Sequence, residues 1–207
     1  MKYMTVNNIL RNKIAVVVRG DSFEEGIKCS EACIKGGLKT IEVAYTNKNA
    51  SDIISNLSDR YNNDVLIGAG TVLDSETARL AILSGAMFIV SPSFNVETAK
   101  LCNRYQVPYI PGCMTINEIL KAMESGCEIL KVFPGGVLGA DFIKSLKAPL
   151  PQALVMVTGG VNIDNYQTWI SKGADAIGIG GEFNKLSSKG KFEEIEELAK
   201  RYSENII

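Results

Sequence analysis

The sequence has 207 residues, of which 46% are hydrophobic and 22% are charged, and its formal net charge is -1. This composition excludes the basic excess of a nucleic-acid-binding protein and the charge blocks of a disordered tail or a membrane-surface protein. The sequence has no histidine, which excludes histidine-based triads, histidine acid–base catalysis and histidine-ligated zinc.

Eight short apolar runs follow one another along the chain, each succeeded by a polar or glycine-containing turn and a helix-like stretch. They span residues 14–19, 40–45, 65–72, 87–93, 108–113, 129–134, 154–160 and 176–181. The runs are almost continuously apolar rather than alternating, which is typical of parallel strands covered on both faces. Residues 1–12 predict an additional N-terminal helix, and residues 191–204 predict the last outer helix.

Local signals mark where the intervening helices begin and end. Ser22 and Thr115 open capping-box patterns, and Asp74, Asn95 and Asn162 are candidate N-caps. A glycine precedes the next strand in "KGGLKTIEV", "SGAMFIV", "SGCEILKV" and "KGADAIGI", which suits the position just after a helix C-terminus.

Eight strand–helix units without a linker predict a single (β/α)₈ TIM-barrel domain over residues 1–207, with an extra N-terminal helix. An open doubly wound sheet is the structural alternative. The first strand is not followed by a G-x-G-x-x-G turn, which argues against dinucleotide binding.

In such barrels the reactive groups lie at the C-terminal ends of the strands. These positions are occupied by Arg19, Glu42, Thr71, Ser91 with Pro92, Cys113, Lys131, Thr158 with two glycines, and Gly180 with Gly181. Two cations, one carboxylate and several hydroxyls are therefore expected to converge at one end of the barrel.

Lys131 lies in the middle of the apolar stretch "EILKVFP". In one interpretation it points outward and extends between the covering helices. In the other it faces the barrel interior, where desolvation disfavours the ammonium form and favours the neutral amine that attacks a ketone. Glu42 is the only carboxylate within a strand core, and it is either an ion-pair partner or a proton shuttle for such chemistry.

Two glycine pairs follow the last two strands, in "VTGGVNIDN" and "IGIGGEF". Backbone N–H groups in front of a helix N-terminus bind anions, and these two loops commonly hold phosphate in barrels. The alternative is that the glycines only form tight turns.

Six segments resemble one family when taken together and in order: "IEVAYTNKNA", "IGAGTVL", "FIVSPSF", "YIPGCMTINE", "LKVFPGG" and "VTGGV". The sequence resembles the KDPG/KHG aldolases, which cleave 2-keto-3-deoxy-6-phosphogluconate (KDPG) or 4-hydroxy-2-oxoglutarate (KHG) through a lysine Schiff base. The resemblance implies a (β/α)₈ barrel, usually a homotrimer, that acts on a small-molecule keto acid without metal or cofactor. From the balanced charge composition we expect no nucleic-acid or membrane partner.

The same resemblance implies a role for each matching residue. Lys131 would form the imine and Glu42 would be the general acid–base. Thr71, Pro92 and Phe133 would line the pyruvate pocket. The distal hydroxyls and phosphate would be held by Thr158, Gly159, Gly160, Gly180 and Gly181.

Two departures from the family pattern concern substrate binding. Many members carry an arginine that grips the substrate carboxylate at the position of Thr46, and our hypothesis is that Arg19 supplies this cation instead. The last glycine loop usually ends in serine, whereas Glu182 follows Gly181 here. A carboxylate beside a phosphate is unfavourable unless it points away, so an unphosphorylated or different sugar acid is an alternative substrate. A phosphogalactonate is a further alternative, because loop side chains decide which epimer is preferred.

Two other functions remain open at this point. The glycine loops alone would suit a barrel that isomerises or decarboxylates a sugar phosphate without covalent chemistry, or one that binds small acids without turnover. The five cysteines contain no C-x-x-C pair, and segment 1–13 does not resemble a secretory signal. We therefore expect a protein of the reducing cytoplasm.

Overall fold

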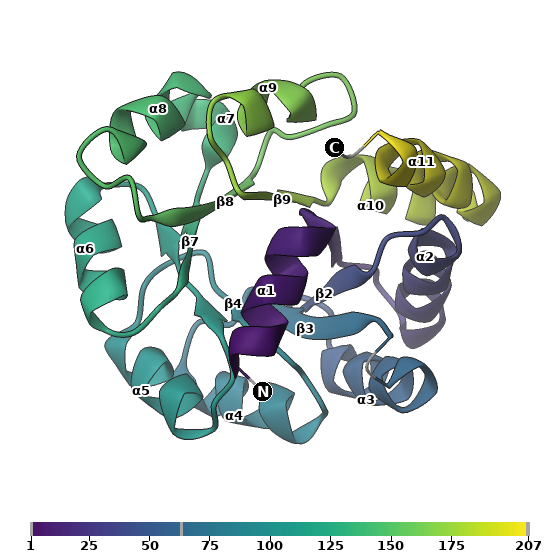
Figure 1. Ribbon diagram of the computed structural model, residues 1–207. Helices are drawn as coiled ribbons and strands as arrows, with labels where there is room; N and C mark the ends of the chain where they lie inside the picture. Colours follow the sequence, from purple (N-terminus) through teal and green to yellow (C-terminus); the bar gives the residue numbers. More distant parts are fainter. Residues whose placement is uncertain (1, 63, 206–207) are drawn as a thin grey trace.

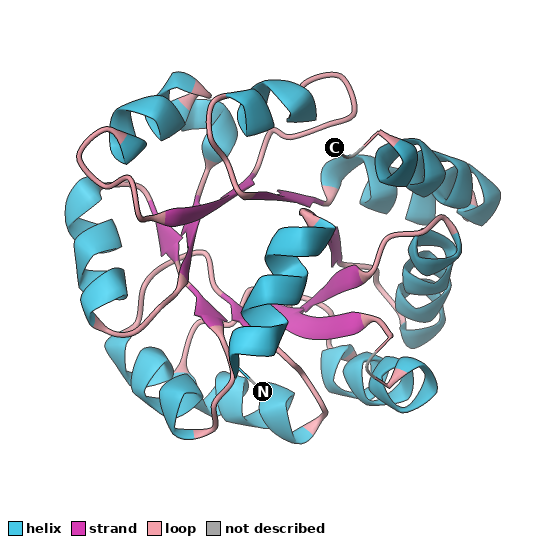
Figure 2. Cartoon of the chain, viewed as in Figure 1, coloured by secondary structure: helices cyan, strands magenta, loops and turns pink. Residues whose placement is uncertain are grey.

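The computed structural model describes residues 2–62 and 64–205 as a parallel sheet surrounded by helices (Figures 1 and 2). The strands are β1 (Ile14–Val18), β2 (Thr40–Ala44), β3 (Leu66–Gly70), β4 (Ile89–Val90), β5 (Tyr109–Ile110), β6 (Gly112–Cys113), β7 (Ile129–Val132), β8 (Leu154–Thr158) and β9 (Ala176–Ile179). The helices are α1 (Lys2–Asn12), α2 (Phe23–Lys35), α3 (Ala50–Tyr61), α4 (Ser75–Leu83), α5 (Val96–Arg104), α6 (Ile116–Glu124), α7 (Gly135–Leu138), α8 (Asp141–Lys147), α9 (Tyr166–Ser171), α10 (Gly181–Ser187) and α11 (Phe192–Glu204).

The sheet closes at Pro111. Its strand order is β5-β4-β3-β2-β1-β9-β8-β7-β6, and every pairing is parallel. The two ends of this order, β5 and β6, are separated only by Pro111, which has no N–H to give to a ladder. Its carbonyl still accepts a hydrogen bond of 2.9 Å from the N–H of Lys131. The fifth predicted run, residues 108–113, therefore forms both short strands. The predicted eight-unit barrel is confirmed, and the alternative of an open doubly wound sheet is wrong.

Four of the five predicted helix starts are confirmed. The side chains of Ser22, Asp74, Asn95 and Thr115 each accept a hydrogen bond from the backbone N–H three residues later. The capping box is complete only at Thr115.

The prediction for Asn162 is wrong, because α9 begins four residues later, at Tyr166. The side chain of Asn162 instead accepts hydrogen bonds from the N–H groups of Asp164 and Asn165. A residue that favours helix starts also favours local turns, and here the turn prevails.

The predicted helix ends are also confirmed. Gly37, Gly85, Gly126 and Gly173 all have φ between 79° and 103°, a region that glycine enters without a Cβ penalty. After each glycine the chain bonds back into the helix, as when the N–H of Ala86 donates to the carbonyl of Ala81 at 3.0 Å. Such closures satisfy helix carbonyls and turn the chain into the next strand.

Apolar side chains form two separate clusters, one inside the barrel and one between the sheet and the helices. The inner cluster contains Phe88, Ile129 and Met156 together with Val6 and Ile9 of α1. In Figure 1, α1 crosses in front of the barrel at the N-terminal ends of the strands. Helix α1 therefore closes the barrel at the N-terminal ends of the strands. The opposite end, at the C-terminal ends of the strands, is called the mouth below and is where we expect the reactive groups.

No helix within the described ranges is both long and apolar enough to cross a membrane.

Candidate active site

Lys131 points into the barrel. Its neighbours Leu130 and Val132 belong to the outer cluster, whereas Ile129 belongs to the inner one. Because side chains alternate along a strand, Lys131 lies on the same face as Ile129. Only 5% of the residue is exposed. The interpretation that Lys131 extends outward between the helices is therefore wrong.

Glu42 enters the same interior from β2. Its neighbours Ile41 and Val43 belong to the outer cluster, and Glu42 itself is only 1% exposed. The carboxylate lies directly against the backbone of Gly70, where any Cβ would overlap it. Its Oε2 atom is buried and has no hydrogen-bond partner among the described residues. A buried carboxylate oxygen left unpaired is unusual and is available to a bound substrate.

Burial raises the pKa of Glu42, and the positive charges of Lys131 and then Arg19 lower it by less. The net effect is a pKa above the ordinary value of a glutamic acid. A carboxyl group with a raised pKa keeps its proton to a higher pH than an ordinary glutamic acid, which suits a group that has both to donate and to accept a proton.

Phe133 connects the lysine to the first glycine pair. The Nζ atom of Lys131 lies 5.2 Å from the centroid of the Phe133 ring. The same ring is close to Gly159, where a Cβ would lie 3.4 Å from the Cδ2 and Cε2 atoms of Phe133. Phe133 is therefore an apolar side chain that contacts the loop after β8 and lies close to the amine.

Thr71 and Pro92 follow β3 and β4, at the same end of the barrel, and both are half-buried. Thr71 has a φ of 56°, which is uncommon for a β-branched residue and costs energy. Backbone strain of this kind is concentrated at functional sites. The backbone of Pro92 packs closely on Gly112, where a Cβ would overlap the carbonyl of Pro92.

Arg19 and Thr46 meet at the mouth. The Nη1 atom of Arg19 donates to the hydroxyl of Thr46 at 3.3 Å. The backbone of Arg19 is fixed on both sides, because its N–H donates to Asn184 Oδ1 at 2.8 Å and its carbonyl accepts from Asn47 Nδ2 at 2.9 Å. The cation is therefore anchored at its base and exposed at its tip.

A cavity of about 450 Å³ opens beside these residues. Its lining includes seven of the predicted site residues: Arg19, Phe133, Thr158, Gly159, Gly160, Gly180 and Gly181. Thr46, Thr71 and Pro92 are outside this lining, and so are the more deeply buried Glu42 and Lys131. The hydroxyl oxygen of Thr158 is buried and has no partner within the described part of the chain.

The sequence did not identify Asn184 and Lys185, which also line this cavity. Both belong to α10, whose N-cap is Gly180. Because glycine has no side chain to cap a helix, no capping side chain in the sequence marks the start of α10. The glycine pair predicts a loop, and a helix of seven residues shows too little periodicity to be recognised in the sequence. The first turn of α10 has N–H groups that lack intrahelical partners, and Lys185 adds a cation on the same rim.

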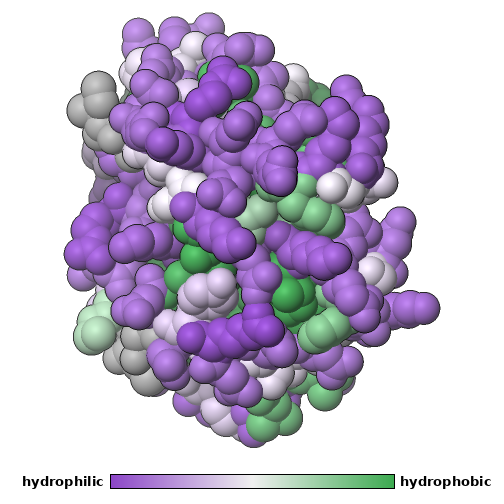
Figure 3. Space-filling model, turned by 90° about the vertical axis from the view of Figure 1, so that its right-hand side faces the viewer, coloured by the Kyte–Doolittle hydropathy of each residue, from purple (hydrophilic) through white to green (hydrophobic). Residues whose placement is uncertain are grey.

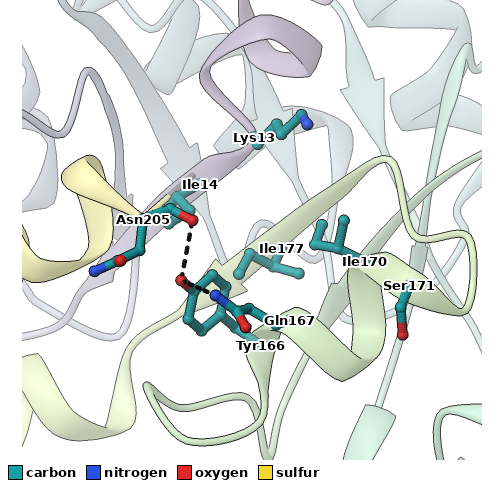
Figure 4. A pocket seen from close by; sticks show the side chains of 8 residues that line it. All are labelled: Lys13, Ile14, Tyr166, Gln167, Ile170, Ser171, Ile177 and Asn205. Atoms are coloured by element: carbon teal, nitrogen blue, oxygen red, sulfur yellow. Dashed lines mark hydrogen bonds between the residues drawn. The ribbon is translucent and has the colours of Figure 1, made fainter. Parts of the chain in front are cut away.

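A second cavity, of about 240 Å³, lies away from the mouth (Figure 4). It is lined mainly by apolar groups of Ile14, Tyr166, Ile170 and Ile177. The hydroxyl of Tyr166 donates to the carbonyl of Asn205 at 3.3 Å across one side of it. None of the predicted site residues lines this cavity, so it is not the candidate site.

Within the described residues, no group of three or more histidine, cysteine, aspartate or glutamate side chains is arranged so that it could hold a metal ion.

The family model and the curated relatives indicate one family. The family model described as KDPG and KHG aldolase matches residues 6–198. A 2-dehydro-3-deoxy-6-phosphogalactonate aldolase of Escherichia coli K12 is 32% identical over 170 residues, which cover 82% of this chain and 83% of the relative. A 2-dehydro-3-deoxy-phosphogluconate aldolase of Treponema pallidum is 34% identical over 162 residues, which cover 78% and 77%. A solved structure described as native KDPGal superposes with a TM-score of 0.80 at 28% identity, over 93% of this chain and 96% of that one.

Proposed function

From the premise that this chain belongs to the KDPG and KHG aldolase family and is a Schiff-base aldolase, we propose that Lys131 forms the imine and Glu42 moves the protons. One observation supports this assignment above the others. Lys131 and Glu42 are both nearly completely buried, on strands whose alternation points both side chains into one barrel interior. The lysine charge also lowers the pKa of the carboxyl group, so the two groups interact.

The first half of the reaction attaches the substrate. The neutral amine of Lys131 adds to the C2 ketone, and the resulting carbinolamine loses water to give a protonated imine. Glu42 supplies and removes the protons that this exchange requires. The charge formed on nitrogen then lies in a site of low solvent access, where electrostatic interactions are strong.

The second half breaks the carbon–carbon bond. The carboxylate of Glu42 removes the proton of the C4 hydroxyl, directly or through a water molecule. The electrons of the C3–C4 bond pass to the protonated imine, which becomes an enamine, and the aldehyde leaves. Glu42 returns its proton to C3, and water hydrolyses the pyruvate imine to free Lys131. Because the imine nitrogen accepts the electrons, the route requires no metal, and we propose that no cofactor participates.

Binding groups at the two ends of the site would hold the substrate between them. Arg19, hydrogen-bonded to Thr46, would bind the carboxylate. Thr71, Pro92 and Phe133 would enclose the pyruvate portion. The distal hydroxyls and the phosphate would contact Thr158 and the backbone of Gly159, Gly160, Gly180 and Gly181, with Lys185 as an additional cation. Fixing both ends aligns C2 with Lys131, and such positioning lowers the barrier substantially.

The proposed reactions are cleavage of KDPG to pyruvate and glyceraldehyde 3-phosphate, and cleavage of KHG to pyruvate and glyoxylate. The name of the Escherichia coli relative favours the phosphogalactonate epimer as a second candidate. A panel of these substrates, with pyruvate release as the measurement, distinguishes them.

Trapping tests the covalent step directly. Borohydride added with pyruvate is expected to fix one reduced pyruvate on the protein, and peptide mass spectrometry should locate it at Lys131. Lys131→Met should abolish the adduct, whereas Lys144→Met, which changes an exposed lysine of α8, should retain it. Absence of an adduct from the unaltered protein would favour a non-covalent sugar-phosphate barrel instead.

We also propose that the chain forms a homotrimer. Large exposed apolar side chains occur on α4–α6 and the loops beside them: Leu73, Leu80, Leu83, Val96, Met114 and Leu120. The face formed by α2, α3 and α11 is by contrast mostly hydrophilic (Figure 3). Light scattering should give three times the chain mass, and Leu83→Asp should lower it. The five cysteines are buried free thiols, which suits the proposed location in the reducing cytoplasm.

A further inference from the structure

We propose that Glu182 and Tyr202 are positioning residues for the distal end of the substrate, joined as a pair that we call the distal clasp. The inference rests on the proposed function and adds to it, since it explains how a carboxylate is compatible with a phosphate-binding rim. Glu182 is the second residue of α10 and lines the cavity at the mouth. Its charge is expected to be held away from the substrate.

One oxygen of Glu182 joins three parts of the chain. Its Oε2 atom accepts a hydrogen bond of 2.6 Å from the hydroxyl of Tyr202 and one of 3.1 Å from the N–H of Ile163. Tyr202 lies on α11, Ile163 lies in the loop after β8, and Glu182 lies at the start of α10. The two glycine pairs of the distal site are therefore connected through a single carboxylate.

Tyr202 is a rigid anchor for this carboxylate. It is completely buried, and its ring contacts that of Tyr166 edge-on at 5.3 Å between centroids and that of Phe183 at 5.9 Å. Burial, and then the hydrogen bond to Glu182, raise the pKa of the Tyr202 hydroxyl. The hydroxyl therefore keeps its proton and donates throughout the physiological pH range.

The loop after β8 transmits this anchoring to the glycines. The side chain of Asn165 donates to the carbonyl of Gly160 at 2.8 Å, and its Oδ1 accepts from the N–H of Asn162 at 2.9 Å. Asn162 in turn braces the N–H groups that follow it. Because Gly160 and Ile163 belong to one hydrogen-bonded loop, a bond that holds Ile163 also restricts Gly160.

The charge of Glu182 can be separated from its hydrogen bonds by substitution. Glutamine retains an oxygen that accepts from both Tyr202 and Ile163 but carries no charge. Alanine removes the charge and both bonds. Tyr202→Phe removes one donor and leaves the charge. If Glu182 repelled phosphate, loss of its charge would improve the binding of a phosphorylated substrate. If Glu182 positions the glycine loops, loss of its hydrogen bonds to Tyr202 and Ile163 would weaken that binding.

The test compares kcat and KM of these three variants with two substrates. In the proposed binding mode KDPG would extend to the glycine loops, whereas the shorter KHG, which has no phosphate, would end before them. We expect Glu182→Ala and Tyr202→Phe to raise KM for KDPG about tenfold, the effect of losing one or two hydrogen bonds, and to leave KM for KHG within about twofold. Glu182→Gln should remain close to the unaltered protein with both substrates. Glu193→Ala, at an exposed position on α11, is the control.

Three outcomes would overturn the proposal. A lower KM for KDPG in both Glu182→Gln and Glu182→Ala would mean that the carboxylate repels phosphate. Equal losses with the two substrates would mean a general structural role. An unchanged KM for KDPG in Glu182→Ala would mean that the clasp does not position the loops. Trapping with pyruvate does not involve the distal end, so all variants should form the Lys131 adduct, and a lack of adduct in the unaltered protein would identify failure of the proposed function itself.

Discussion

The guanidinium of Arg19, at the end of β1, donates a hydrogen bond to the hydroxyl of Thr46, just beyond β2, at 3.3 Å. Thr46 occupies the position at which many members of the family carry the arginine that binds the substrate carboxylate. The cation of Arg19, which follows the neighbouring strand, reaches this position. This contact agrees with the hypothesis that Arg19 binds the substrate carboxylate, which remains a prediction.

Substitution of Arg19 tests that hypothesis. Arg19→Ala should raise KM for both KDPG and KHG by roughly 10- to 100-fold, because a charge-assisted bond to a carboxylate contributes about 1.5–3 kcal/mol. Arg19→Ala combined with Thr46→Arg should recover much of the loss, since the new guanidinium starts from a neighbouring point on the mouth. Arg201→Ala, on the outer helix α11, is the control. An unchanged KM in Arg19→Ala would defeat the hypothesis.

Substitution of Glu42 should separate proton transfer from imine formation. Glu42→Gln keeps the shape of the side chain but cannot exchange a proton, so kcat should fall by about 10²- to 10⁴-fold. The borohydride adduct at Lys131 should still form, although more slowly. Glu97→Gln, on the exposed face of α5, should leave both measurements unchanged. Retention of normal kcat by Glu42→Gln would exclude Glu42 as the acid–base.

The same substitution should increase stability in a pH-dependent way. Burial raises the pKa of Glu42 in the folded protein above the ordinary value of 4.5. Well below pH 4.5 the group is neutral in both the folded and the unfolded state, so its ionisation does not change the free energy of unfolding. As the pH rises through 4.5 toward the raised pKa, ionisation stabilises the unfolded state first, so folding is progressively penalised.

Thermal melts across this range measure the effect. Glu42→Gln should raise Tm by a few degrees at neutral pH, and the difference should shrink toward zero as the pH falls to 4.5. A difference that stays constant between pH 4 and pH 7 would contradict the raised pKa.

Much of the barrel was predictable because its signals are local. The strands are short apolar runs, and the helix ends are glycines whose positive φ, as at Gly85, requires that residue. The direction of Lys131 was not predictable. Strands covered on both faces are apolar at every position, so no alternation reveals which face is inside.

Other features depend on contacts between distant parts of the chain. The direction of Glu182 is set by Tyr202, twenty residues away on another helix. The short helices α7 and α10 begin within three residues of the end of the preceding strand, and they are too brief to show a helical period. Sequence patterns describe the scaffold, whereas the fine arrangement of this site comes from pairings that no pattern records.

The two glycines of β3 provide a matched pair of variants for the site. A Cβ at Gly70 would overlap the carboxylate of Glu42, whereas a Cβ at Gly68 would overlap the ring of Phe88 in the inner core. Both alanine variants should lose stability, because adding a methyl group to a packed interior typically costs about 1–3 kcal/mol. Only Gly70→Ala should lose kcat as well, by at least about tenfold, because it displaces the acid–base from its position.

Comparing kcat per folded molecule with Tm separates the two effects. Gly68→Ala should show a lower Tm with kcat within about twofold, since Phe88 packs among inner-core side chains and is not one of the proposed site residues. The lysine adduct should form in both variants. Equal kcat in the two variants would mean that the carboxylate against Gly70 is not the group that moves the proton.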